Sequence, residues 1–209
     1  MPVTDTPSTG ACAADGTAQN DHNSVAQNDS DSTVQNSAAR YRAAIICASD
    51  RCFQGLRKDE SSSIIAEMLS GQGYEIAATA VLPDEYEALR AAMAGIADEG
   101  RADLIITTGG TGLAPRDTTP EATAAVIDRA VPGIPEAMRA GSMKITPHGM
   151  LSRGIAGIRK HTLIINLPGS PKAAQENLAC VLPALDHALL VLTGGTQDCA
   201  AAEANRKHF

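Results

Sequence analysis

From residue 42 onwards, short runs of apolar residues alternate with longer stretches of helical periodicity. The apolar runs are residues 43–48, 75–82, 103–107 and 162–166. Such runs are typical of strands that are buried on both faces of a mostly parallel sheet, and the helical stretches between them would cover those faces. The sequence therefore predicts an α/β fold, a three-layer α/β/α sandwich with a mostly parallel sheet.

The stretches between the strands have the apolar spacing of amphipathic helices. Residues 64–69 and residues 89–96 each present one apolar face, and residues 173–192 predict a long helix that Pro183 is expected to kink or split. Residues 149–161 lack a clear period, so we expect a loop and a short edge strand there.

The first 39 residues contain five aspartates, no Lys or Arg and almost nothing apolar. Because such a segment cannot bury enough apolar surface to offset the entropy of ordering, we predict a disordered acidic tail over residues 1–39. The predicted domain covers residues 40–196, and a flexible tail follows over residues 197–209. Of the net charge of −7, the first tail supplies −5, so the remainder of the chain is close to neutral.

These properties exclude several classes of function. A near-neutral domain does not favour binding to nucleic acid or to an anionic membrane, and an aromatic content of 2% argues against base-stacking platforms. No apolar run approaches the roughly 20 residues of a membrane span, and no export signal is visible. Five cysteines without a CxxC pair indicate a reduced, cytoplasmic chain, with Cys47 expected to be a buried core thiol.

Polar or glycine-bearing turns follow each predicted strand, where an open parallel sheet binds its ligands. The turns are Ser49-Asp50-Arg51, Pro83-Asp84-Glu85, Thr108-Gly109-Gly110-Thr111-Gly112 and Asn166-Leu167-Pro168-Gly169-Ser170. The third turn suits an anion, because its glycines let backbone N–H groups approach the anion without a clash of Cβ atoms, and its threonines add hydroxyl donors. It matches neither a Walker loop nor GxGxxG, and a tight strand-to-helix turn is the alternative interpretation.

Two aspartates flank this glycine-rich turn. Asp117 is either a magnesium ligand beside bound phosphates or a carboxylate that satisfies the start of the next helix. Asp84 has the same two interpretations, since Glu87 lies three residues beyond it as in a capping box. The pair favours phosphoryl or nucleotidyl transfer.

Basic residues occur in the same turns and loops, and they predict a local anion pocket, although each one taken singly fits a solvated surface charge. They are Arg51, Arg57, Lys58, Arg116, Arg153 and Lys172. Ser152 and Asn166 fit ordinary turn and strand-end polar groups, and Ser170 fits an N-cap before Pro171. The five histidines show no pairing with a nucleophile, so we assign no catalytic histidine.

Five ordered blocks between residues 42 and 194 match a known family. They are Ser49-Asp50-Arg51 with Gly55 and Asp59-Glu60-Ser61, Leu82-Pro83-Asp84-Glu85, TTGGTGLAPRDTTPEAT at residues 107–123, Met150-Leu151-Ser152-Arg153 with Ala156-Gly157-Ile158-Arg159, and Ile165-Asn166-Leu167-Pro168-Gly169-Ser170-Pro171. In these blocks the chain resembles the molybdenum cofactor biosynthesis proteins of the molybdopterin adenylyltransferase (Mog/MoaB) type.

The resemblance implies an enzyme that transfers AMP from ATP to molybdopterin, with release of pyrophosphate. It implies Asp84 and Asp117 as the essential carboxylates, acting through Mg²⁺ and ATP positioning. The turn Thr108, Gly109, Gly110, Thr111, Gly112 would hold the phosphates. The molybdopterin-binding residues would be Ser49, Asp50, Ser152, Asn166, Pro168, Gly169 and Ser170.

The resemblance also implies a homotrimer and, because no metal-insertion domain is fused to this chain, a separate molybdenum insertase. Ser62 stands where relatives often have Gly, and this difference is expected to alter the approach of the backbone near the turn after the first strand. Two other hypotheses stay open: a molybdopterin-binding or carrier protein of the same fold without efficient catalysis, and a generic nucleotide-binding α/β module. Retention of both Asp84 and Asp117 favours the enzyme.

A chain that begins near Arg40 is expected to keep both its melting temperature and its activity, because the predicted tail contributes no apolar surface to the core. Thermal unfolding and turnover of the shortened and full-length chains would be compared side by side. A large loss of either property would show that residues 1–39 belong to the folded unit.

Overall fold

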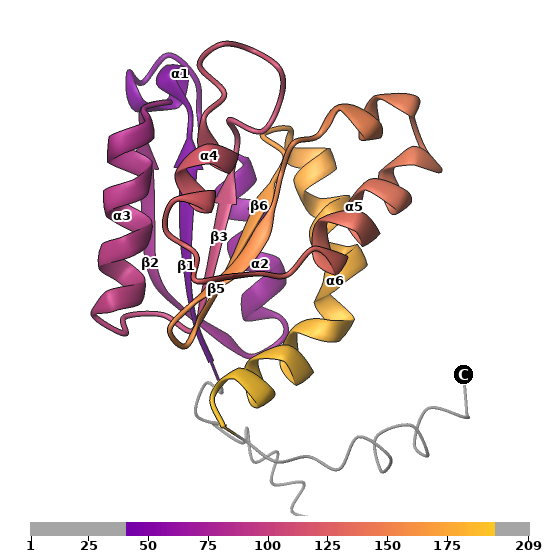
Figure 1. The fold of residues 1–209 in the computed structure, drawn as a ribbon. Helices are drawn as coiled ribbons and strands as arrows, with labels where there is room; N and C mark the ends of the chain where they lie inside the picture. Colours follow the sequence, from indigo (N-terminus) through magenta and orange to yellow (C-terminus); the bar gives the residue numbers. More distant parts are fainter. Residues whose placement is uncertain (1–40, 195–209) are drawn as a thin grey trace, which may run out of the picture. The chain divides into compact units, whose positions relative to one another are not determined.

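The computed structural model describes residues 41–194 (Figure 1). Both predicted tails lie outside these described residues. Within them, all four predicted strands form, each with bounds within two residues of the prediction. The helices lie on both sides of one sheet, which confirms the predicted three-layer α/β/α architecture.

The sheet has six strands in the order β2-β1-β3-β6-β5-β4. Four are parallel: β1 (Tyr41–Ala48), β2 (Tyr74–Leu82), β3 (Leu104–Thr108) and β6 (Thr162–Leu167). Two are antiparallel to their neighbours: β5 (Ala156–Arg159) and β4 (Arg129–Ala130). The mostly parallel sheet is confirmed, but β5 is not the edge, because the two-residue strand β4 pairs outside it.

Helices cover both faces of the sheet. On one face lie α2 (Ser61–Ser70), α5 (Gly133–Met143) and α6 (Pro171–Leu192), and on the other lie α3 (Tyr86–Asp98) and α4 (Thr119–Ala124). The short helices α1 (Asp50–Phe53) and η1 (Pro147–Leu151) lie in connections. Helix α6 runs unsplit through Pro183, since this proline is exposed and the carbonyl group that loses its hydrogen bond, that of Ala179, belongs to an exposed residue.

The core is divided by the sheet into two aliphatic clusters. Ile45 and Ile106 point towards α2 and α6, whereas their neighbours Ile46 and Ile105 point towards α3 and α4. This division follows from the two-residue repeat of a strand, which sends successive side chains to opposite faces. All four isoleucines are 1% exposed or less, which explains why the strands read as unbroken apolar runs.

The winding of the sheet positions the candidate site. From β1 the chain first adds β2 on one side and then crosses back to add β3 on the other side. Connections that leave neighbouring strands in opposite directions open a crevice at the carboxyl ends of those strands. The turns after β1 and β3, at the top of Figure 1, border this crevice. Within residues 41–194, no helix combines the length and apolarity that crossing a membrane requires.

We predict that Ile106→Ala lowers the free energy of unfolding by about 2–5 kcal/mol, because it leaves a cavity in the middle of a fully buried strand. Val191→Ala is the matched control, since Val191 is 56% exposed and its truncation is expected to change stability by less than about 0.5 kcal/mol. Urea denaturation measures both. Equal losses for the two variants would contradict the assignment of the core.

Candidate active site

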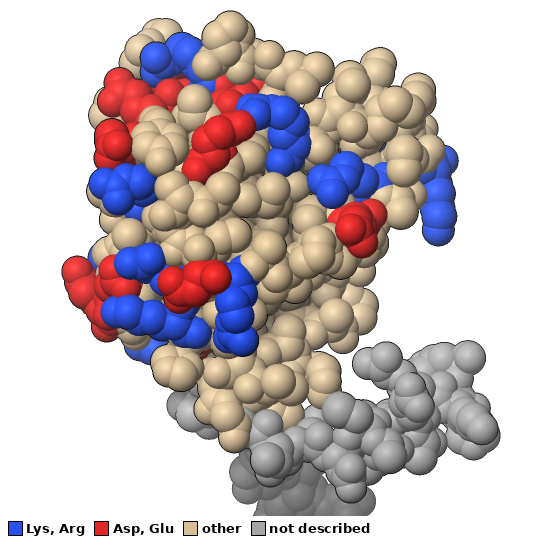
Figure 2. All heavy atoms as spheres, in the orientation of Figure 1, with Lys and Arg blue, Asp and Glu red and all other residues tan. Residues whose placement is uncertain are grey.

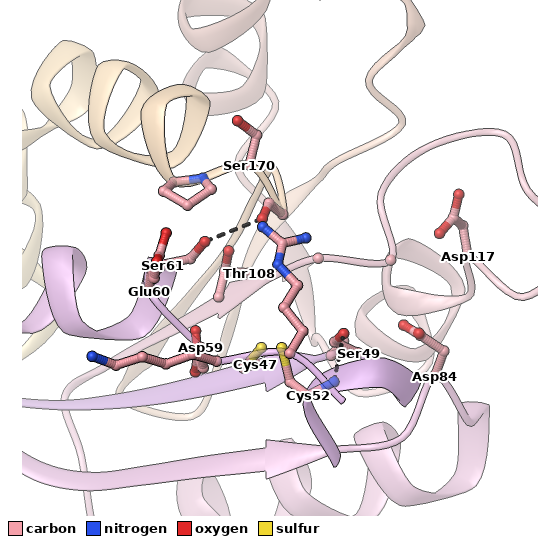
Figure 3. Close-up of a pocket in the computed structure, with 17 residues that line it drawn as sticks. Cys47, Ser49, Cys52, Asp59, Glu60, Ser61, Asp84, Thr108, Asp117 and Ser170 are labelled. Carbon is pink, nitrogen blue, oxygen red and sulfur yellow. Dashed lines mark hydrogen bonds between the residues drawn. The ribbon is translucent and has the colours of Figure 1, made fainter. Parts of the chain in front are cut away.

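A cavity of 350 Å³ opens at the carboxyl ends of the parallel strands (Figure 3). Eight of the residues predicted from the sequence line it: Ser49, Asp84, Thr108, Gly109, Gly110, Asp117, Gly169 and Ser170. They come from the turns after β1, β2, β3 and β6, so the fold brings together positions that lie up to 121 residues apart in the chain. We call this space the first cavity.

The floor of the first cavity is a close contact between backbone turns. Gly109 and Gly110 have positive φ values of 95° and 63°, and a Cβ atom on them would clash with the Ala48 carbonyl oxygen and the Thr119 hydroxyl respectively. A Cβ on Gly169 would lie 3.0 Å from the Gly109 Cα. Only glycine fits this junction, so the glycine-rich turn is more than a flexible connection.

Hydrogen bonds fix the turn after β6 to the rest of the site. The Thr108 hydroxyl donates to the Pro168 carbonyl oxygen at 2.7 Å, and the Ser61 hydroxyl donates to the Gly169 carbonyl oxygen at 3.1 Å. Helices α2 and α6 begin here, with Ser61 and Ser170 at the cavity wall. Their N-terminal ends carry partial positive charge, which favours an anion in the cavity.

Asp84 and Asp50 hold each other through a reciprocal pair of hydrogen bonds. The Asp50 N–H donates to Asp84 Oδ2 at 2.9 Å, and the Asp84 N–H donates to Asp50 Oδ1 at 3.1 Å. Asp84 is not the N-cap of α3, because Glu85 occupies that position and no side chain caps it there. The capping-box interpretation of Asp84 is therefore wrong, and its carboxylate belongs to the cavity.

The charges around this pair are unevenly compensated. Arg116 donates two hydrogen bonds to the Asp50 carboxylate, at 2.6 and 2.8 Å, and thereby lowers the pKa of Asp50. For Asp84, burial raises the pKa, and the negative charges of Asp50 and Asp117 add to the effect. Figure 3 shows Asp84 and Asp117 on the same side of the cavity. Two half-buried carboxylates at one cavity are suited to a divalent cation.

Of the six predicted basic residues, Arg51 is exposed and lines neither this cavity nor the neighbouring one, and the other five divide into two groups. Arg57 and Lys58 line the first cavity, as expected for anion-binding groups. Arg116 and Arg153 instead form ion pairs with Asp50 and Glu121. The Lys172 side chain is 79% exposed, and its Nζ lies 3.9 Å from the Glu176 carboxylate. Figure 2 shows acidic and basic side chains interspersed at both ends of the sheet. The predicted anion pocket therefore depends on Arg57 and Lys58.

A second cavity of 260 Å³ adjoins the same turns. Four predicted residues line it: Thr111, Gly112, Ser152 and Pro168. Leu151, Arg139 and Asn177 complete a wall that combines apolar surface with a few polar groups. Because Gly109 and Gly110 line the first cavity and the next two residues line the second, the glycine-rich turn separates the two spaces.

Asn166 lies on neither cavity wall. Its side chain is buried and donates to the hydroxyls of Thr107 and Thr123, at 2.9 Å each, while its Oδ1 accepts the Ile155 N–H at 3.2 Å. Asn166 thus links β6 to β3, α4 and the segment before β5. In this structure its side chain supports the turns and would not face a ligand in either cavity.

Sequence reasoning missed that two cysteine side chains line the first cavity. The expectation that Cys47 is buried is confirmed, but its thiol also borders the cavity beside Cys52 and Asp59. Burial is the main cause that raises the pKa of Cys47, and Asp59 and Cys52 add to it. A thiol with a raised pKa stays protonated at neutral pH, so Cys47 is not a nucleophile.

The unusual Ser62 is 4% exposed in the first turn of α2, and its hydroxyl has no hydrogen-bond partner among the described residues. Its backbone N–H is satisfied by the Asp59 carboxylate at 3.0 Å. The start of α2 thus keeps its hydrogen bond to Asp59 with serine at this position, and Ser62 does not line the first cavity.

The family described as a probable molybdopterin binding domain matches residues 44–187. A molybdopterin adenylyltransferase of Helicobacter pylori strain 26695 is 42% identical over 157 residues, which cover 72% of this chain and 86% of the relative. The molybdopterin adenylyltransferase of Escherichia coli K12 is 40% identical over 140 residues, which cover 66% of this chain and 71% of the relative.

The fold is also similar to a solved structure, that of the molybdopterin biosynthesis enzyme MoaB from Thermus thermophilus. The TM-score is 0.71 with 50% sequence identity, and the match covers 74% of this chain and 97% of the other. The family match includes all turns that line the first cavity, because these turns lie within residues 44–187.

We predict that Asp84→Asn raises the melting temperature at pH 7 by about 1–3 °C. The raised pKa means that the charged carboxylate opposes folding: this penalty is absent below the unfolded pKa and develops as pH rises through the folded pKa. The gain should therefore disappear below about pH 4.

Asp98→Asn is the matched control with the opposite sign. Arg159 and Lys160 lower the pKa of Asp98 to about 2, so its charge stabilises the fold at neutral pH and this stability is lost as pH falls towards 2. Calorimetry at pH 7 and pH 3.5 compares the two variants. A melting temperature that falls for both at pH 7 would contradict the electrostatic account of Asp84.

Proposed function

The chain belongs to the family of probable molybdopterin binding domains, and from this premise we propose that it transfers AMP from ATP to the terminal phosphate of molybdopterin, with release of pyrophosphate. The observation that carries the proposal is the composition of the first cavity. Asp84 and Asp117 share this cavity with Arg57, Lys58 and two helix N-termini. Such a site binds phosphates and neutralises charge, as nucleotidyl transfer requires.

The phosphates of ATP would occupy the first cavity. Arg57 and Lys58 supply formal positive charge, and the ends of α2 and α6 at Ser61 and Ser170 supply N–H dipoles. The junction at Gly109 leaves no room for a side chain between the turns, so backbone packing holds the glycine-rich turn in place at the cavity.

Molybdopterin would extend across the glycine-rich turn. Its terminal phosphate would lie in the first cavity, near Ser49 and Gly169, and its ring would enter the second cavity, where Ser152 and Pro168 form part of the wall. With few aromatic residues in the chain, polar groups and backbone turns would orient the ring. Asp50 would contribute by fixing Asp84, as its hydrogen bonds indicate.

The carboxylates fit Mg²⁺ as the accompanying cation. Burial raises the pKa of Asp84, and the negative charges of Asp50 and Asp117 raise it further, so a bound cation would stabilise the charged carboxylate. Within residues 41–194, no group of three acidic, histidine or cysteine side chains could enclose a metal ion, so phosphates and water would complete the coordination of Asp84 and Asp117. Bound there, Mg²⁺ would stabilise charge on the transferring phosphate.

The transfer itself needs no catalytic histidine. A terminal phosphate has a second pKa near 6, so its oxygen is already ionised at neutral pH and can attack the α-phosphorus of ATP directly. The bond from the α-phosphorus to the bridging oxygen breaks, and the electron pair leaves with pyrophosphate. The protein's task is to align the two phosphates, and the fixed turns at Thr108 and Gly169 provide that alignment.

Three further features belong to the same proposal: a homotrimer, a cytoplasmic location and a separate molybdenum insertase that receives the adenylylated product. The alternative is a molybdopterin-binding protein of the same fold without efficient catalysis. The presence of both Asp84 and Asp117 at one cavity favours the enzyme, because a binding protein has no need for two carboxylates beside the phosphates.

With ATP, Mg²⁺ and molybdopterin, the wild type is expected to release pyrophosphate and form adenylylated molybdopterin. Asp117→Asn is expected to be about 10²–10³-fold slower, since it removes one of the two carboxylates that would hold Mg²⁺ at the transferring phosphate. Asp128→Asn is the matched control, because Asp128 bonds to the Lys160 N–H and does not line the cavity. If the wild type binds molybdopterin but releases no more pyrophosphate than Asp117→Asn, the protein is a carrier.

A further inference from the structure

Arg153 is a basic residue beside the site that lines neither cavity. The sequence placed it among the anion-binding residues, but its side chain turns to the protein instead. Its Nε donates to the Gly112 carbonyl oxygen at 2.6 Å, one terminal nitrogen donates to the Asp117 carbonyl oxygen and the other pairs with the Glu121 carboxylate. One guanidinium thus holds two carbonyl groups of a single loop, at Gly112 and Asp117, and ties them to Glu121 in α4.

The loop that carries Gly112 and Asp117 is called the Asp117 loop and is defined as residues 109–118. Residues 113–116 are all exposed, and Leu113 is 67% exposed, so apolar packing contributes little to the position of the loop. Inside the loop, the Ala114 N–H donates to Asp117 Oδ2 at 2.9 Å, which ties the direction of the carboxylate to the shape of the loop. The position of the Asp117 carboxylate therefore depends on the polar contacts between the loop and the rest of the protein.

Two arginine side chains hold the Asp117 loop in position. Arg116 reaches from the loop to Asp50 through an ion pair whose arginine side chain is 57% exposed, so water and salt weaken that contact. Arg153 is 34% exposed and binds the backbone at Asp117 itself, and its own N–H donates to the Thr111 carbonyl oxygen at 2.9 Å. Of the two arginines, Arg153 contacts Asp117 more directly and is better shielded from solvent.

We propose that Arg153 is a positioning residue for the transfer reaction: by holding the Gly112 and Asp117 carbonyl groups it fixes the Asp117 carboxylate at the first cavity without touching a substrate. The inference deepens the proposed function and rests on it. A planar guanidinium with five donors suits this task, because it can reach two carbonyl oxygens and a carboxylate at fixed angles. A lysine ammonium keeps the charge but cannot span the three acceptors.

Loss of a positioning contact affects the transition state more than the binding of ATP. We expect Arg153→Gln to lower kcat about 10–100-fold while KM for ATP stays within about threefold, because a displacement of the Asp117 carboxylate by about 1 Å is enough for such a loss. Arg153→Lys should show most of the same loss of kcat, and Glu121→Gln should show a smaller loss. The double variant that combines Arg153→Gln with Glu121→Gln should be no slower than Arg153→Gln alone, since both changes break one network.

Arg159→Lys is the matched control. Arg159 also makes three contacts, two with the Asp98 carboxylate at 2.7 and 3.1 Å and one with the Val126 carbonyl oxygen at 2.8 Å, but it lines neither cavity. Its kcat should stay within about twofold of the wild type. Turnover is measured well below the melting temperature of every variant, so that a loss of folded protein does not imitate a loss of kcat.

Hydrogen exchange of residues 109–118 gives a readout that does not depend on turnover, and Arg153→Gln should accelerate it. Unchanged exchange and unchanged kcat would overturn the proposal, as would a higher KM with an unchanged kcat, which would make Arg153 a binding residue. If the wild type itself releases no pyrophosphate, the proposed function fails. In that case faster exchange in Arg153→Gln still supports the positioning role, and unchanged exchange overturns it.

Discussion

The site depends on one steric constraint, the contact of backbone turns at Gly109. There the end of β3 approaches the Ala48 carbonyl at the end of β1 and the Gly169 Cα after β6, and no Cβ atom fits between them. Three strands can therefore end at one point and deliver their turns to one cavity. The positive φ values of Gly109 and Gly110 then direct the chain into the long loop that carries Asp117.

Electrostatics is the second constraint on the site, and it acts against stability. Arg116 compensates Asp50, but Asp84 remains beside two other carboxylates and its pKa is raised. Arg57, Lys58 and the starts of α2 and α6 line the same cavity and provide positive potential. An anion bound with a divalent cation would satisfy the basic and the acidic groups at once, which is why we interpret this combination of charges as a device for binding phosphates.

The fold was largely predictable from the sequence, because each central strand is buried on both faces and reads as an apolar run. Helix α5 and strand β4 were not predicted, since β4 has two exposed residues and α5 begins without a side-chain cap. The site residues were predictable from the ends of the strands. The partners of Asp84, Asn166 and Arg153 were not, because they depend on contacts between segments 11 to 59 residues apart. Spacing along the chain carries no signal for such contacts.

The most direct measurement is a crystal structure with Mg²⁺ and an ATP analogue whose bond between the α- and β-phosphates cannot be cleaved. We expect the cation between the α-phosphate and the carboxylates of Asp84 and Asp117, and the outer phosphates at Arg57, Lys58 and the start of α2. A nucleotide bound away from the first cavity, or a cation that contacts neither aspartate, would contradict the assignment of this cavity as the site of AMP transfer.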